Sequence, residues 1–103
     1  MATVHIALDR QRIKDFCRKW KITRMALFGS VLRDDFRPDS DVDVLVKYAP
    51  DVDWSSYDYF AMRDDIEVLF ARSVDVVEEG SIRNPIKRRC IYENLEIVYE
   101  SGR

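Results

Sequence analysis

Two aspartates one residue apart, preceded at a fixed distance by a glycine–serine pair, are the residues of this chain best suited to chemistry. Gly29-Ser30 is followed, after ten intervening residues, by Asp41-Val42-Asp43. Alternate residues of a strand point to the same side, about 6.6–7 Å apart, so both carboxylates would face one site. Mg²⁺ prefers such hard oxygen ligands, with phosphate oxygens and water completing its shell. The pattern therefore indicates a site for a metal-bound phosphate group.

A third carboxylate and the glycine–serine turn would complete this site. Asp75 interrupts an otherwise apolar predicted strand over 74–78, so it is the candidate to complete a two-metal site or to accept the proton of an attacking hydroxyl. Gly29 has no Cβ and would let backbone approach a phosphate. Ser30 and the N–H groups of the following helical turn would donate hydrogen bonds to it. Arg33 could add a cation there, although an exposed position is equally consistent.

The chain has 19 acidic residues, so a single Asp-x-Asp pair is weak evidence on its own. Asp39, Asp41 and Asp43 also imitate the start of a calcium-binding loop. That loop requires Gly where Val44 stands and Glu where Pro50 stands, which excludes it. The combination of turn, spacing and third carboxylate favours a metal and phosphate site over a chance arrangement.

Length and composition limit the other classes of function. At 103 residues the chain is expected to form one domain over 1–103. A net charge of -2 argues against a nucleic-acid-binding surface, which needs clustered Lys and Arg. Neither a membrane span nor a signal peptide is expected, so the predicted location is cytoplasmic. Cys17 and Cys90 lack CxxC spacing and are expected to be buried free thiols in helices.

Hydrophobic periodicity predicts the elements that must position the site. Helices are predicted over 9–20, about 59–71 and 85–93, the last with Asn84 as N-cap and Pro85 in its first turn. Strands are predicted over 22–28, 41–48, 74–78 and 95–100. This order predicts an α/β (α+β) fold, in which helices pack on a small mixed sheet.

Alternation along the strands predicts which side chains share a face. In the strand over 41–48, Asp41, Asp43 and Leu45 are expected on one face and the intervening valines on the other. In the last strand, Leu95, Ile97 and Tyr99 alternate with Glu96, Val98 and Glu100, which predicts a half-exposed strand.

Several aromatic and basic residues lie outside the motif. Trp54 and Tyr57 are either partner contacts or pack over the sheet edge, with packing favoured, and Tyr59 and Phe60 are expected in the core. A basic cluster is interpreted first as a solvated helix face and second as a site for an acidic partner or a nucleotide. It comprises Arg83 and residues 87–89.

The stretch from Phe28 to Val46 resembles the GS-x10-DxD motif of minimal nucleotidyltransferases, within the DNA polymerase beta-like superfamily. It is most similar to the MntA-type antitoxins of HEPN/MNT toxin–antitoxin systems, and the similarity in element order extends over about residues 9–99. The resemblance implies the nucleotidyltransferase fold. It also implies that Asp41, Asp43 and Asp75 are catalytic and hold Mg²⁺, as two ions. The nucleotide-binding candidates are Gly29, Ser30, Arg33 and Ser40.

The activity implied by this resemblance is transfer of AMP from ATP to a tyrosine of a HEPN ribonuclease toxin, with release of pyrophosphate. A hetero-oligomer with that toxin is then expected. Two alternatives stay open: a non-catalytic antitoxin that neutralises its toxin by covering it, and a nucleotidyltransferase acting on a small molecule such as an antibiotic. A chain this short favours a protein acceptor, although a homodimer could also build an acceptor pocket.

Overall fold

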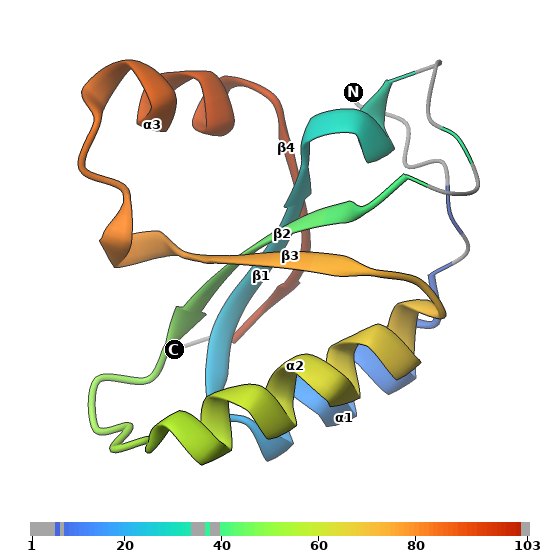
Figure 1. Ribbon diagram of the computed structural model, residues 1–103, viewed down its shortest axis with the longest axis vertical. Coiled ribbons are helices and arrows are strands. Elements are labelled where there is room, and N and C mark those ends of the chain that lie inside the picture. The colour runs from blue at the N-terminus through green and yellow to red at the C-terminus, as the bar shows by residue number, and fades with distance from the viewer. Residues whose placement is uncertain (1–5, 7, 34–36, 38–39, 102–103) are drawn as a thin grey trace.

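The computed structural model describes residues 6, 8–33, 37 and 40–101 (Figure 1). Part of the segment between the Gly29-Ser30 turn and Asp41 therefore lies outside the described residues, including Pro38 and Asp39. No helix in the described part is both long and apolar enough to cross a lipid bilayer.

The described residues form a mixed four-stranded sheet, as predicted. Its strands are β1 (Ile22–Phe28), β2 (Val42–Tyr48), β3 (Val74–Glu78) and β4 (Leu95–Glu100), in the order β3-β2-β1-β4. β1 runs antiparallel to both β2 and β4, whereas β2 and β3 are parallel. A parallel pair needs a crossover connection, and α2 (Ser56–Phe70) supplies it. The predicted α+β fold with a small mixed sheet is confirmed.

The helices cover the two faces of the sheet unequally (Figure 1). α1 (Arg10–Lys19) and α2 lie together on one face, over the larger hydrophobic core, which includes Val42, Val44 and Val46. α3 (Pro85–Glu93) covers the other face, where Leu45 packs in a smaller cluster with Ile91. The predicted two-faced alternation of β2 is therefore confirmed. Because Asp43 alternates with Val42 and Val44, it lies on the α3 face.

Capping residues set the helix boundaries. Asp9 caps α1, its carboxylate accepting the Arg12 N–H at 3.1 Å. α2 begins at Ser56, before the first apolar residue of its stripe, because Ser55 and Asp58 form a reciprocal capping box. Asn84 caps α3 with Pro85 in the first turn, as predicted.

The last strand departs from its predicted alternation. Met25 pairs with Tyr99 but Ala26 pairs with Ile97, so Val98 is an extra residue opposite that step of β1. Such a bulge reverses the facing of side chains beyond it. Val98 is therefore buried, whereas Ile97 is 42% exposed.

Side chains from the helices hold the backbone of both edge strands. The Val74 N–H of β3 donates to Glu67 Oε2 at 3.2 Å, and the Val74 carbonyl accepts from Arg63 Nη2 at 3.1 Å. At the opposite edge, the Val98 carbonyl of β4 accepts from Arg10 Nη1 at 3.0 Å. These bonds tie α2 to β3 and α1 to β4.

Three expectations about individual side chains were wrong. Cys17 is buried as expected, but Cys90 on α3 is exposed. Phe60 is 60% exposed rather than in the core, and Tyr57 is 81% exposed rather than packed on the sheet edge. Both belong to the first turns of α2. The predicted packing of Trp54 is confirmed, since its ring lies 4.6 Å from that of Tyr48.

Candidate active site

The Gly29 turn brings the end of β1 against the Asp43 carboxylate. Gly29 has a φ of +77°, a left-handed backbone conformation that residues other than glycine rarely adopt. A Cβ at this position would also collide with Asp43 Oδ2. Both constraints require glycine here. The predicted helical turn follows as a short 3-10 helix over Gly29–Leu32, where the Arg33 N–H donates to the Ser30 carbonyl at 2.9 Å.

The parallel pairing of β2 and β3 brings two of the predicted carboxylates together. Asp43 is the direct register partner of Asp75, and paired residues of adjacent strands point to the same face. Asp41 lies one residue before β2 begins and is exposed. The predicted strand over 41–48 thus starts one residue later than expected.

Asp43 lies close enough to Asp75 and to Asp41 to be affected by the charge of each. The pKa of Asp43 is raised above its ordinary value, first by burial and then by repulsion from the carboxylates of Asp75 and Asp41. The Arg33 guanidinium opposes this effect and lowers the Asp43 pKa. The site therefore combines concentrated negative charge with one neighbouring cation.

The residues present fit a hard divalent cation by their chemistry. Asp43 and Asp75 offer carboxylate oxygens from neighbouring strands, and Asp41 adds another beside them. Within the described residues, no three His, Cys, Asp or Glu side chains are already grouped to hold a metal ion together. The repulsion that raises the Asp43 pKa is what a bound cation would relieve. A shared Mg²⁺ site therefore remains a prediction.

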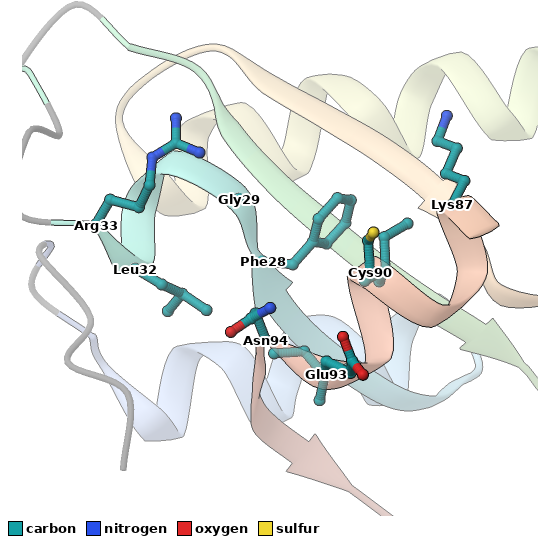
Figure 2. Close-up of a pocket in the computed structure, with 10 residues that line it drawn as sticks. Phe28, Gly29, Leu32, Arg33, Lys87, Cys90, Glu93 and Asn94 are labelled. Carbon is teal, nitrogen blue, oxygen red and sulfur yellow. The ribbon is translucent and has the colours of Figure 1, made fainter.

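A cavity of about 840 Å³ adjoins the turn and separates it from α3 (Figure 2). Its walls come from the turn on one side and from α3 and the start of β4 on the other. The lining residues are Phe28, Gly29, Leu32, Arg33, Lys87, Cys90, Ile91, Glu93, Asn94 and Leu95. This volume falls within the range of small-molecule and cofactor sites.

The predicted nucleotide-binding residues are not all at this cavity. Gly29 and Arg33 line it, whereas Ser30 and Ser40 do not. The Ser40 hydroxyl instead accepts the Arg37 N–H at 3.3 Å in the turn that precedes Asp41. Arg72, which had no assigned role, donates to the Ser40 carbonyl at 3.4 Å and so supports that turn.

Sequence reasoning missed most of the cavity wall. Lys87 belonged to a basic cluster whose second interpretation was a nucleotide site, and that signal was available. Cys90 and Asn94 carried no signal, because only the packing of α3 across the end of β1 brings them opposite Phe28.

The nucleotidyltransferase domain model matches residues 10–98 of this chain. The chain belongs to this family. Its predicted enzyme class, a nucleotidyltransferase, is thereby confirmed. The match extends from the first residue of α1 into β4, so it includes the turn, the aspartates and the cavity.

Relatives of this nucleotidyltransferase support the assignment. It is 33% identical over 89 residues to a Methanocaldococcus jannaschii protein named provisionally as a protein adenylyltransferase, covering 86% of this chain and 89% of that one. It is 27% identical over 86 residues to the protein adenylyltransferase MntA of Thermococcus cleftensis, covering 84% of this chain and 82% of that protein.

Solved structures share the fold. A structure named provisionally as a minimal nucleotidyltransferase matches with a TM-score of 0.67 and 28% identity, over 84% of this chain and 86% of that one. A toxin–antitoxin structure with AMP-PNP gives a TM-score of 0.71 at 18% identity, over 92% and 76%. The complex of a tri-AMPylated Shewanella oneidensis HEPN toxin with its MNT antitoxin gives 0.63 at 17% identity, over 89% and 70%.

Proposed function

We propose that this nucleotidyltransferase is a Mg²⁺-dependent protein adenylyltransferase and antitoxin, which transfers AMP from ATP to a tyrosine of a HEPN-type toxin. The observation that carries the proposal is the Asp43–Asp75 pair, which faces one side of the sheet beside the Gly29 turn. The names of the Thermococcus cleftensis and Methanocaldococcus jannaschii relatives support protein adenylylation. The AMPylated HEPN toxin in complex with an MNT antitoxin supports the type of acceptor and partner.

In this reaction the tyrosine oxygen forms a bond to the α-phosphorus of ATP, and the bond from that phosphorus to the β-bridging oxygen breaks. Pyrophosphate leaves, and the proton of the hydroxyl passes to a carboxylate. Asp41 and Asp43 would hold Mg²⁺, and Asp75 would either complete that site or accept the proton. When bound, Mg²⁺ would neutralise charge on the triphosphate and on the leaving pyrophosphate. Gly29 and Ser30 would bind phosphates, with Arg33 as a neighbouring cation and Ser40 supporting the approach to Asp41.

The test is Asp43→Asn, which removes one carboxylate charge and changes the volume of the side chain little. With α-labelled ATP, the variant is expected to label a co-purified toxin at least about 100-fold more slowly than the wild-type protein does. The reason is that positioning and charge stabilisation supply most of the rate. Its thermal unfolding should stay close to wild type. Asp53→Asn, in an exposed loop, is the matched control and should label normally. Unchanged labelling by Asp43→Asn would refute the assignment of Asp43.

A second candidate is neutralisation by covering alone. It is favoured by the exposure of Tyr57 (81%) and Phe60 (60%) at the start of α2, since aromatic residues are enriched at protein interfaces.

Mass spectrometry separates the two candidates, because a toxin produced with this protein should gain about 329 Da for each AMP transferred. If an Asp41/Asp43 double variant still neutralises the toxin without any mass gain, covering is the mechanism. Mass gain on a small molecule, with none on the toxin, would identify the antibiotic-type alternative.

A further inference from the structure

We propose that the cavity between the Gly29 turn and α3 binds the nucleoside half of the nucleotide, with the Phe28 ring as its stacking surface and the Asn94 amide recognising the base edge. This inference rests on the proposed function, because it assumes that the phosphates lie at the Gly29 turn beside Asp43. It assigns the base to the opposite side of β1, against the end of α3.

The strand register sets the direction of the bound nucleotide. Phe28 pairs with Asp43 of β2 on one side and with Leu95 of β4 on the other. Asp43 and Leu95 are therefore two strand spacings apart, about 10 Å. A nucleotide with its α-phosphate near Asp43 would cross the end of β1 through its ribose. Its base would then lie beside Leu95.

The chemistry of the lining changes along the same direction. At the phosphate end, Gly29 and Arg33 line the cavity, and Arg33 is close enough to Asp43 to lower the Asp43 pKa. Toward β4 the wall offers apolar surface from Phe28, Ile91 and Leu95, while the α3 side adds the polar side chains of Lys87, Glu93 and Asn94. Aromatic and aliphatic side chains hold a base by stacking and apolar contact, whereas cations hold phosphates.

Asn94 and Glu93 are the polar residues at the base end of the cavity, and Asn94 is the one that can both donate and accept. Figure 2 shows its amide directed from the end of α3 into the space beside Phe28. Among the described residues no hydrogen bond engages this amide, and the residue is exposed. An Asn amide can donate to adenine N7 and accept from adenine N6 at the same time. Guanine presents two acceptors on that edge, so the Asn94 carbonyl would be left without a donor. The site is therefore expected to prefer ATP over GTP.

Cys90 provides a direct probe of occupancy, because it is an exposed thiol on the cavity wall. Cys17 is fully buried, and burial raises its pKa to about 12, so it should not react with N-ethylmaleimide in the folded protein. Intact mass would then count the alkylation of Cys90 alone. We expect ATP and adenosine each to slow this alkylation at least fivefold. Inorganic tripolyphosphate should give little protection, and equal protection by tripolyphosphate and ATP would overturn the proposal.

Two substitutions to the same large residue test the cavity independently. Cys90→Trp would obstruct it, whereas Ile86→Trp adds the same side chain to α3 at a position that is 75% exposed and outside the cavity. Calorimetric titration with AMP-PNP should show at least about tenfold weaker binding for Cys90→Trp and no change for Ile86→Trp. Equal affinity in both variants would overturn the proposal.

Asn94→Ala tests base recognition, and Ile86→Ala is its control. The ratio of the Kd for GMP-PNP to the Kd for AMP-PNP is expected to fall roughly tenfold in Asn94→Ala, in line with the discrimination that one bidentate contact provides. An unchanged ratio would refute the role of Asn94.

These binding measurements separate this proposal from the proposed function. Protection of Cys90 by ATP without any AMP transfer to the toxin would support the nucleoside site and refute the transfer activity. Transfer without protection of Cys90 would refute the nucleoside site and leave the transfer activity standing.

Discussion

The sequence and the structure both require glycine at position 29, but for different reasons. The motif predicts a glycine so that backbone can approach a phosphate. The structure adds that the Asp43 carboxylate occupies the space where a Cβ would lie. This contact was not predictable from spacing, because ten residues separate Ser30 from Asp41 and only the pairing of Phe28 with Asp43 closes that gap.

Gly29→Ala is therefore expected to impair catalysis more than stability. The left-handed φ should cost about 1–2 kcal/mol of unfolding free energy, measurable by urea denaturation. Displacement of Asp43 should lower AMP transfer roughly 100-fold, since a misplacement of about 1 Å can have that effect. Gly80→Ala is the control, because its added Cβ would meet only the flexible end of Glu78. Comparable losses of transfer in the two variants would contradict this account.

At the scale of elements, α2 positions the strand that carries Asp75. Arg63 and Glu67 bind the carbonyl and the N–H of Val74, the residue immediately before Asp75. The sequence predicted both the helix and the strand but assigned no role to Arg63. Its periodicity identified the apolar stripe of α2, whereas a polar side chain that reaches the edge of a sheet leaves no periodic pattern.

Arg63→Met removes the donor to Val74 and keeps much of the side-chain length. We expect a loss of about 1 kcal/mol in stability. Under the proposed function, the Mg²⁺ concentration needed for half-maximal AMP transfer should also rise. Arg18→Met, on the exposed side of α1, should change neither quantity. A purely structural role would lower the amount of folded enzyme but leave its Mg²⁺ dependence unchanged. That result would show that Arg63 does not position Asp75.

At the scale of the whole molecule, the sequence predicted the elements and the mixed sheet but not the arrangement around the site. Local patterns determined the boundaries of β1 and α3 well, because their apolar spacing and caps are local signals. The strand order β3-β2-β1-β4 and the placement of α3 over the other face depend on contacts between distant segments. For that reason the cavity, and the exposure of Cys90, had to come from the structure.

The packing of α1 against α2 gives the molecule a pH-dependent contribution to stability. Asp65 accepts hydrogen bonds from Trp20 Nε1 at 2.9 Å and Lys19 Nζ at 3.0 Å, and these partners lower its pKa. A lowered carboxylate pKa stabilises the fold above the unfolded pKa, and that stability is lost as pH falls through the folded pKa.

Asp65→Asn should therefore lower the unfolding free energy near neutral pH by no more than about 1 kcal/mol, because the carboxylate is partly exposed and screened. The difference from wild type should shrink as denaturation is repeated toward about pH 3. Asp64→Asn, the exposed neighbour on α2, is the control. A constant difference across this pH range would show that charge on Asp65 is not the cause.

The arginines that bind the outer strands also bear on aggregation. An open sheet ordinarily offers two rows of unpaired backbone groups on which another chain can align and grow. Here the Val74 carbonyl is occupied by Arg63 and the Val98 carbonyl by Arg10. A strand added at either edge would have to displace a guanidinium at these positions. Strand-to-strand pairing with another chain should consequently be disfavoured at these two positions.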